Sequence, residues 1–303
     1  MDRPICDAVR RVLRCPACGG PLCEDERSLA CGPCGLHYGC TPSGSLDLRL
    51  QAPKVVRDEY VVGTPLLPPS GFEFAPMRPN PRPEVDFSGV ETPFHLTAEL
   101  MSYFPRARTP DSLMLDLGCG TTIHRAVCER AGFQYVGLDY DTPEAPLQGD
   151  AHALPFADAS FEFVLAVAVL EHLRFPFVVM REAFRVLRPG GVLAGSVAFL
   201  EPFHADSFYH HTHLGTYSAL CHGGFEVLQV CPSDTWRVLD AHADMAFFPK
   251  MPRPLSVSLV APLKAAHWLW WRLGRVVNPK ATEENRRIAT TGAQAFVARR
   301  PAA

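Results

Sequence analysis

Leu113-Met-Leu-Asp-Leu-Gly-Cys-Gly-Thr121 runs from a short apolar segment into two closely spaced glycines. A helical pattern follows over residues 121–131, and Gly132 stops it. Glycines at a strand-to-helix turn let the backbone approach a ligand closely. The segment therefore predicts a strand, a ligand-binding turn and a helix, which form the first unit of an α/β fold.

The same alternation of strand and helix patterns continues along the chain after this unit. The apolar run 161–169 has the composition of a strand that is buried on both faces. A helix is expected over 176–187, ending at a Pro-Gly-Gly signal. Further strands are expected at 135–138, 191–199, 226–231 and 294–298. This order predicts a doubly wound, mainly parallel sheet.

Length and composition divide the 303 residues into three parts. Residues 1–50 are rich in cysteine, 51–110 form a proline-rich linker with a lead-in helix at 92–104, and 111–303 form the large domain. A helical insertion is expected near 236–290. The net charge of −3 argues against an overall electrostatic attraction of the protein to nucleic acid or to an anionic membrane. No signal peptide or spanning segment is visible, so a cytoplasmic location is expected.

Two Cys-x-x-Cys pairs stand out in the N-terminal part, Cys15-Pro-Ala-Cys18 and Cys31-Gly-Pro-Cys34. Zinc prefers four thiolates in a tetrahedron, and two such turns joined by a hairpin supply them. A redox dithiol is the alternative, but no thioredoxin-like βαβ context surrounds the pairs. We therefore expect a structural zinc ribbon, whose balanced charges favour packing or partner docking over RNA binding.

Acidic residues recur at the predicted strand ends after the glycine turn. Asp139 ends the second strand, about twenty residues after the glycines, where a carboxylate can accept hydrogen bonds from ribose hydroxyls. Gly149-Asp150-Ala-His-Ala-Leu-Pro-Phe156 follows, and the apolar strand then ends in Val169-Leu-Glu-His172. Alone, each acidic residue reads as a surface turn, but in this order they indicate a nucleotide site.

The five motifs across residues 112–200 resemble class I S-adenosylmethionine (SAM)-dependent methyltransferases of the type 11 group. They are Leu-Asp-Leu-Gly-Cys-Gly, Val-Gly-Leu-Asp, the run around Gly149-Asp150, Leu-Glu-His-Leu and Arg-Val-Leu-Arg-Pro-Gly-Gly. The resemblance covers about a third of the chain and implies a Rossmann-like fold and methyl transfer from SAM. The cysteine module is similar to zinc-ribbon-like units found in some of these enzymes.

The resemblance also implies a role for particular residues in binding SAM. The methionine part would be lined by Asp116, Gly118, Cys119 and Gly120. Asp139 would hold the ribose, and Tyr140 would flank the adenine. Asp150 would meet the adenine amino group, while Ala151 would offer its backbone N–H.

Two departures from the family pattern bear on this site. Thr122 stands where a third glycine is usual, and it would either crowd the turn or donate its hydroxyl. Pro143 and Pro146 lie between Asp139 and Asp150, so the usual helix there is expected to be shortened or lost. We therefore hypothesise that the proline-rich segment or the ribbon covers the cofactor on this side.

The methyl-acceptor side is expected near the ends of the fourth and fifth strands. His204 and His211 are the leading candidates for a general base, and His172 either joins them or positions a loop. The surrounding segment 201–213 is rich in histidine and has three interpretations. It supplies acceptor contacts, binds a metal that orients the acceptor, or is a polar loop whose histidines bond to the backbone.

The late segment around Trp268-Leu-Trp-Trp271 is aromatic, and the C-terminal end is basic. A buried helix is the favoured interpretation. The segment could also wall a hydrophobic acceptor pocket, lie on a membrane surface in peripheral contact, or form the face of a homodimer.

The function favoured by the sequence is methyl transfer to a small-molecule acceptor, as in the tailoring of a natural product or saccharide. An RNA-base methyltransferase that holds RNA with the ribbon is the first alternative, and the neutral ribbon argues against it. A non-catalytic SAM-fold protein that binds a partner is the second. Loss of the glycine turn or of Asp139 would favour it, and both are present.

Overall fold

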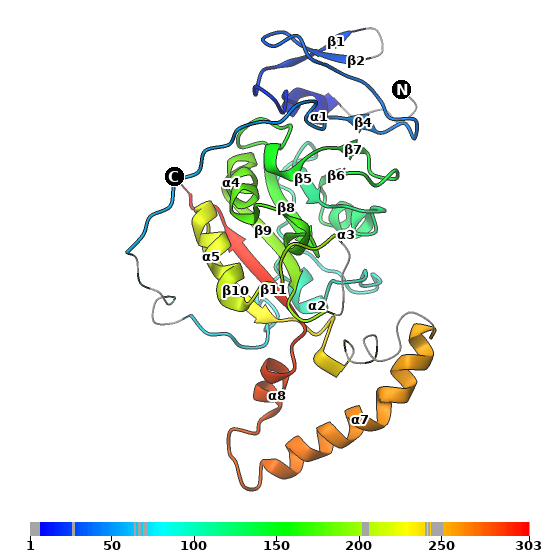
Figure 1. Ribbon diagram of the computed structural model, residues 1–303, viewed down its shortest axis with the longest axis vertical. Helices are drawn as coiled ribbons and strands as arrows, with labels where there is room; N and C mark the ends of the chain where they lie inside the picture. Colours follow the sequence, from blue (N-terminus) through cyan, green and yellow to red (C-terminus); the bar gives the residue numbers. More distant parts are fainter. Residues whose placement is uncertain are drawn as a thin grey trace.

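A mostly parallel eight-stranded sheet forms the centre of the protein (Figure 1). The computed structural model describes residues 7–25, 28–63, 65, 68, 72–201, 206–239, 241, 243 and 251–302. The sheet order is β10-β11-β9-β8-β5-β6-β7-β4. Only β11 runs against its neighbours β9 and β10; the other pairs are parallel. The predicted Rossmann-like fold is confirmed. The strands are β4 (Leu46–Asp47), β5 (Leu113–Leu117), β6 (Gln134–Asp139), β7 (Leu147–Gln148), β8 (Phe161–Val167), β9 (Leu187–Ala198), β10 (Glu226–Pro232) and β11 (Ala293–Arg299).

Helices cover both faces of the sheet, because alternate side chains of each strand point to opposite faces. Leu113, Leu115 and Leu117 of β5 pack in one cluster with residues of α4 (Pro176–Val186) and α5 (His213–Gly223). Met114 belongs to a second cluster with α2 (Ala98–Met101) and α3 (Arg125–Arg130). Every residue of β5 and β8 is buried, as the apolar run 161–169 predicts.

The N-terminal module is docked against the core rather than tethered to it. It contains α1 (Asp7–Val12) and a small antiparallel sheet of β1 (Leu22–Asp25), β2 (Ser28–Cys31) and β3 (His37–Tyr38). Its chain then enters the large sheet as β4, parallel to β7. The Arg14 amide donates to the Pro155 carbonyl at 2.9 Å, and the Ser45 hydroxyl donates to the Ala145 carbonyl at 2.6 Å. The proposed boundary at residue 50 thus falls just after a strand of the shared sheet.

Local differences from the sequence expectations have simple causes. The helix expected over 92–104 is only the single turn α2, which Thr97 caps, although Leu96 and Phe104 are buried as expected. The helix expected over 121–131 begins at Arg125, because Thr122 holds a left-handed φ of 63° before it. Between Asp139 and Asp150 there is a turn and β7 but no helix, which confirms that the usual helix is lost.

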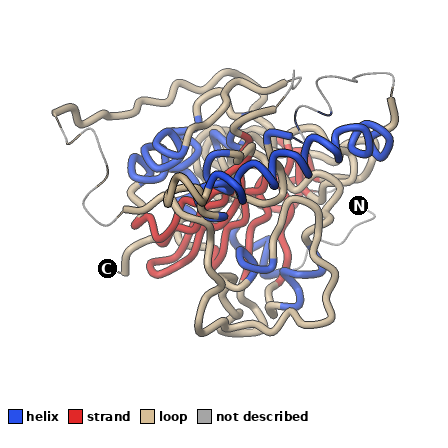
Figure 2. Tube along the Cα trace, turned by 90° about the horizontal axis from the view of Figure 1, so that it is seen from below, coloured by secondary structure: helices blue, strands red, loops and turns tan. Residues whose placement is uncertain are grey.

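The expected late insertion contains α7 (Arg253–Gly274) and is followed by α8 (Glu283–Ala289). Figures 1 and 2 show α7 as a long helix that runs along the end of the molecule opposite the ribbon. The interpretation as a buried helix is wrong, because most of its large apolar side chains are exposed. Apolar composition alone does not separate a core helix from one with an uncovered face. No helix in the described part of the chain is long and apolar enough to span a membrane.

Candidate cofactor site and metal centre

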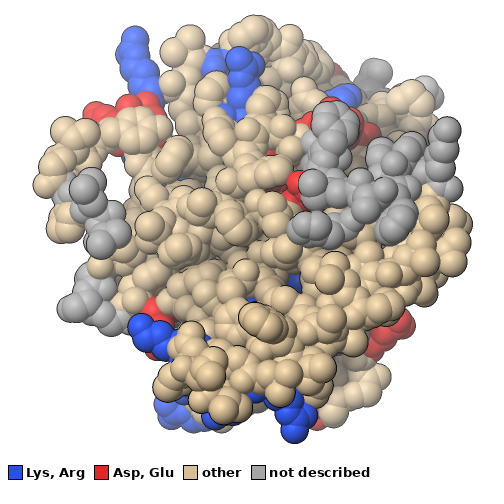
Figure 3. All heavy atoms as spheres, turned by 60° about the horizontal axis from the view of Figure 1, so that its bottom comes forward, with Lys and Arg blue, Asp and Glu red and all other residues tan. Residues whose placement is uncertain are grey.

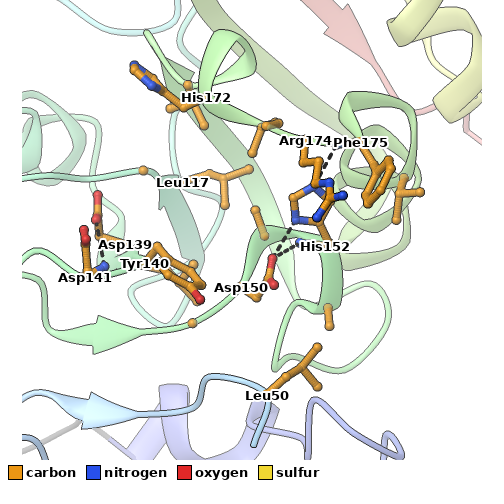
Figure 4. Close-up of a pocket in the computed structure, with 18 of the residues that line it drawn as sticks. Leu50, Leu117, Asp139, Tyr140, Asp141, Asp150, His152, His172, Arg174 and Phe175 are labelled. Carbon is orange, nitrogen blue, oxygen red and sulfur yellow. Dashed lines mark hydrogen bonds and ion pairs between the residues drawn. The ribbon is translucent and has the colours of Figure 1, made fainter. Parts of the chain in front are cut away.

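A cavity of about 1340 Å³ opens at the carboxyl ends of β5, β6 and β8 (Figure 4). Ligands bind at this edge in open α/β sheets, because loops there diverge from the strand ends. Its walls include five of the eight residues predicted to hold SAM, namely Gly118, Asp139, Tyr140, Asp150 and Ala151. The remaining three predicted residues, Asp116, Cys119 and Gly120, lie outside this lining.

The glycine turn is the tightest part of the site. Gly118 has a φ of +69°, and a Cβ there would lie 2.5 Å from Cγ2 of Val169. Its amide donates to the Leu138 carbonyl at 2.8 Å, which ties the turn to β6. Gly120 also has a positive φ, of 47°, but a Cβ on it would meet open space. Position 118 therefore excludes any side chain for two reasons, and position 120 for one.

Asp116 lies beneath the turn rather than in the cavity. Its side chain is fully buried, and the Tyr135 hydroxyl donates to its Oδ2 at 2.6 Å. Nδ1 of His124 lies 3.5 Å from the same oxygen. Burial and the Asp116 charge raise the pKa of Tyr135, which keeps that hydroxyl a donor. Asp116 therefore joins β5 to Tyr135 of β6 and to His124, which follows the glycine turn, through contacts that are buried.

Asp139 connects the glycine turn to the loop that follows β6. Its Oδ2 accepts from the Gly120 amide at 3.0 Å, and its Oδ1 accepts from the Thr142 amide at 3.3 Å. A carboxylate offers about four acceptor sites, so it can also take a ligand hydroxyl. Tyr140 is 59% exposed, and the guanidinium of Arg49, which follows β4, lies 5.9 Å from its ring centre.

Asp150 is linked through His152 to Phe175, the residue that precedes α4. Its Oδ1 accepts from the amide of His152 at 2.9 Å and lies 2.6 Å from Nδ1 of that ring. Nε2 of His152 accepts from the Phe175 amide at 3.0 Å, so Nδ1 carries the proton that Asp150 receives. Burial alone would raise the pKa of Asp150, but these contacts with His152 outweigh it and lower the pKa. The carboxylate is therefore ionised near neutral pH.

The second wall of the cavity comes from the segment that follows the ribbon, residues 50–63, which we call the strap. Leu50 to Val56 line the cavity opposite the glycine turn. Further along, the half-buried Asp58 accepts from Arg181 of α4 at 2.7 Å and lies 2.7 Å from Nε2 of His222 in α5. Tyr60 stacks on the His222 ring, with centroids 4.6 Å apart. These contacts fasten the strap across α4 and α5.

The predicted acceptor-side histidines fall in different environments. His172 lines the cavity, and its Nδ1 lies 3.1 Å from the Asp206 carbonyl (Figure 4). His211 is buried, and its Nε2 lies 3.2 Å from the Leu170 carbonyl, outside the lining. Burial lowers the pKa of His211, although the hydrogen bond to Leu170 acts in the opposite direction. His204 lies outside the described residues.

Three residues that sequence reasoning did not single out also shape the site: Asp58, His152 and Glu171. Glu171 is 1% exposed, and its Oε1 accepts from the Ala198 amide at 3.3 Å. Its Oε2 has no hydrogen-bond partner among the described residues. Burial raises the pKa of Glu171 to about 7. The sequence marked His152 and Glu171 only as members of motifs, and nothing local distinguished Asp58 from other surface acids.

The four predicted zinc ligands converge in the ribbon. The Sγ atoms of Cys15, Cys18, Cys31 and Cys34 all lie within 4.8 Å of one another. Cys15 and Cys34 are 3.6 Å apart, and Cys18 and Cys31 are 3.4 Å apart. Zn–S bonds of about 2.3 Å give tetrahedral edges of roughly 3.8 Å, so the thiols fit zinc after small shifts that lengthen some separations and shorten others. A full set of four sulfur ligands is typical of a structural site.

Comparisons with known proteins agree with the fold and the turn. Residues 115–195 match the family described as a methyltransferase domain. An uncharacterized methyltransferase of Mycobacterium marinum is 35% identical over 104 residues, which are 30% of this chain and 41% of that protein. The 27-O-demethylrifamycin SV methyltransferase of Amycolatopsis mediterranei is 35% identical over 122 residues, 34% of this chain and 44% of that protein.

The matched region spans less than half the length of these curated relatives. Among solved structures, the S-adenosylmethionine-dependent methyltransferase of Mesorhizobium loti has a TM-score of 0.41 and 15% identity, over 66% of this chain and 95% of that one. The family match falls on β5 to β9, where the glycine turn and the acidic strand ends were found. Residues 115–195 of the chain are therefore similar to a methyltransferase domain.

Proposed function

We propose that the protein transfers the methyl group of SAM to a small-molecule acceptor. The observation that carries this proposal is one cavity in which the Gly118 turn, Asp139 and Asp150 converge. Its volume of about 1340 Å³ exceeds the ~300–1,000 Å³ of an ordinary ligand pocket. There is room for a nucleoside cofactor and a second molecule beside it.

The residues present fit SAM, which supplies an activated methyl group on a positively charged sulfur. Asp139 can accept hydrogen bonds from both ribose hydroxyls. Within the described chain, the hydrogen bonds of the Asp150 side chain go to Oδ1, so Oδ2 can meet an amino group. The exposed Tyr140 ring offers a face for a base. Lys54 and the other strap residues at the cavity reduce the access of water to the reacting groups.

On the acceptor side, we assign proton removal or acceptor positioning to His172. It lines the cavity, and its contact with the Asp206 carbonyl orients the ring. A histidine can accept a proton near neutral pH. His211 instead contacts the Leu170 carbonyl, a geometry suited to holding residues 206–211 in place. A role for His204 stays a prediction from the sequence.

The charge of the cavity favours a small neutral or cationic acceptor over RNA. Its lining carries the carboxylates of Asp139, Asp141, Asp150 and Asp206, against the cations of Lys54 and Arg174. Phosphate backbones are bound by surfaces with excess positive charge. The relative that methylates a rifamycin precursor, by its name, is in keeping with natural-product tailoring.

Calorimetric titration with SAM and with S-adenosylhomocysteine tests the cofactor step. We expect micromolar binding, with a loss of about tenfold or more in Asp139→Ala because two hydrogen bonds to the ligand disappear. Asp111→Ala is the matched control, since Asp111 is exposed at the opposite end of β5. Equal affinity in wild type and Asp139→Ala would place the cofactor elsewhere.

The acceptor class is tested separately with methyl-labelled SAM. The protein is incubated with an extract of its source cells, which is then separated into small-molecule, RNA and protein fractions. Label in the small-molecule fraction, lost in His172→Ala, supports the proposal. Label in RNA would instead favour the RNA-base methyltransferase, and SAM binding without any transfer would favour a partner-binding protein.

A further inference from the structure

The most unusual surface of the molecule is one face of α7. Six large apolar side chains lie on it at intervals of three or four residues or their multiples, which places them along one side of the helix. Trp270 is the most exposed of them, at 74%. The set, which we call the α7 stripe, consists of Leu255, Leu259, Leu263, Leu269, Trp270 and Leu273.

The side of α7 next to this stripe faces the protein. Ser256 and Val260 are buried there, and His267 and Trp271 on the same side are half-buried. The Trp271 indole donates to Nε2 of His267 at 3.0 Å. Each side chain of the α7 stripe remains at least 49% exposed among the described residues. Water-exposed apolar stripes of this size usually mark a binding surface.

The charge around the stripe is of one sign. Residues 251–281 contain five cations and no Asp or Glu, in a chain whose net charge is −3. Arg272 lies 5.1 Å from the centre of the Trp268 ring. The cations are Arg253, Lys264, Arg272, Arg275 and Lys280. An apolar face with tryptophan and leucine, in a segment that has basic residues and no Asp or Glu, matches helices that lie at the surface of anionic bilayers.

We propose that α7 docks the protein on an anionic membrane surface, with the α7 stripe buried among the lipid headgroups and upper acyl chains. The helix lies in the plane of the interface, in agreement with the finding that no described helix can span a bilayer. Tryptophan and leucine supply the apolar contact, and Arg272, Arg275 and Lys280 attract acidic headgroups. Figure 3 brings this end forward and shows wide surface areas without charged side chains.

Docking through α7 also sets an orientation. β10 runs parallel to β9, because both are antiparallel to β11. The chain therefore leaves β10 towards α7 at the same edge of the sheet where the cavity opens. An α7-docked molecule would turn this edge, rather than the ribbon end, towards the membrane.

The charge pattern favours lipid over a second copy of the chain. Pairing two α7 helices would bring two segments with five cations each together, without a carboxylate in either. Like charges at close range are destabilising and cost affinity. Anionic lipid headgroups neutralise the same cations.

Vesicle binding tests the proposal on the full-length protein. Vesicles of phosphatidylcholine with about 30% phosphatidylglycerol carry the negative surface that attracts basic residues, and phosphatidylcholine alone does not. Three of the four tryptophans lie in α7, and the fourth, Trp236, is buried. We expect co-sedimentation and a blue shift of tryptophan emission with the anionic vesicles, and much weaker binding to phosphatidylcholine.

Three variants distinguish binding through the α7 stripe from non-specific binding to vesicles. Trp270→Asp and Leu263→Asp should each weaken vesicle binding about tenfold, because they place a charge in the inserted face. The double variant Arg272→Glu with Arg275→Glu should weaken it by at least as much and only on anionic vesicles. Val62→Asp is the matched control, since Val62 is 90% exposed in the strap and should leave binding unchanged.

Two results would overturn the proposal. One is that the wild-type protein, shown by its melting temperature to be folded, stays in the supernatant when anionic vesicles are sedimented. The other is a dimer in light scattering that Leu263→Asp converts to a monomer while the wild type ignores lipid, which would assign the stripe to a second copy. Thermal melting of each variant confirms that the loss of binding is not a loss of folding.

Discussion

One wall of the cavity is built from the ends of β5, β6 and β8, and the other from the strap that follows the ribbon. The first wall carries recognisable motifs, because its residues meet local structural requirements: Gly118 forms a tight turn, and Asp139 lies at the end of a strand. The strap has no motif. It reaches the cavity because β4 joins the sheet beside β7 and because Asp58 is held by α4 and α5.

This difference implies that the two walls of the cavity are stabilised in different ways. The motif wall is held by the sheet, whose strands β5 and β8 are buried throughout. The strap wall depends on a small ribbon with little apolar core of its own, and such modules fold on the binding energy of a metal. Perturbations of the two walls should therefore differ in size and in what they affect.

The largest effect is expected from breaking the zinc site. Structural zinc binding is worth about 10–16 kcal/mol in small modules, so Cys31→Ser or chelation should unfold the ribbon. The strap then loses its anchor at β4, and ordering it again on binding costs SAM affinity on the order of tenfold. Zinc content by mass spectrometry and SAM titration measure the two losses.

Cys23→Ser is the matched control, because Cys23 is exposed in β1 and lies outside the four-sulfur cluster. It should keep both zinc and SAM binding. Full SAM affinity in a zinc-free protein would show that the strap holds its place without the ribbon, and the distinction between the two walls would then be lost.

The next largest effect is expected in the motif wall. Gly118→Ala adds a methyl group 2.5 Å from Val169 at a left-handed φ, which should cost about 2–5 kcal/mol from overpacking and strain together. Gly120→Ala meets open space and should cost only the strain, about 1–2 kcal/mol. Urea unfolding and SAM titration compare the pair, and zinc content should stay constant in both. Equal costs would mean that Val169 moves aside freely.

Sequence reasoning recovered the motif wall and the sulfur cluster, because both are encoded in local patterns. The spacing of residues along the sequence was enough to predict that Asp139 lies at a strand end by the cavity and that the four cysteines lie close together. It missed Asp58, whose partners Arg181 and His222 lie far along the chain. It also predicted a buried helix where α7 is exposed, since an apolar sequence does not reveal what covers it.

Two carboxyl groups, the buried Glu171 after β8 and the half-buried Asp58 of the strap, should give opposite pH dependences. For Glu171, burial raises the folded-state pKa to about 7, so folding stability falls as pH rises from about 4.5 through 7. This loss is on the order of 2–3 kcal/mol between pH 5 and 8. Glu171→Gln should remove it, becoming more stable than wild type at pH 8 but hardly at pH 5.

Asp58 in the strap behaves in the other direction. Burial would raise its pKa, but the hydrogen bond and charge of His222, with help from Arg181, outweigh burial and lower it. Its contribution is therefore present above the usual carboxyl pKa and is lost only in acid. Asp58→Asn should cost about 1–2 kcal/mol through weakened charge-assisted bonds at both pH 5 and pH 8. Thermal melts at the two pH values measure both variants, and parallel slopes for wild type and Glu171→Gln would contradict the assignment.

The smallest effect concerns one of the two departures from the family pattern, Thr122, which stands where the family has glycine. Its φ of 63° is costly for a β-branched residue, and its recorded hydrogen bonds are main-chain contacts with Cys119 and Arg125 that glycine would keep. Thr122→Gly should therefore raise stability by up to about 1 kcal/mol, part of the relieved strain being offset by greater chain entropy in the unfolded state. Thr121→Gly, at a residue without a positive φ, should instead lower stability by a few tenths of a kcal/mol. Urea unfolding without cofactor gives both values. A less stable Thr122→Gly would mean that the hydroxyl makes a contact the turn depends on, and strain would then not be the reason that glycine prevails at this position in the family.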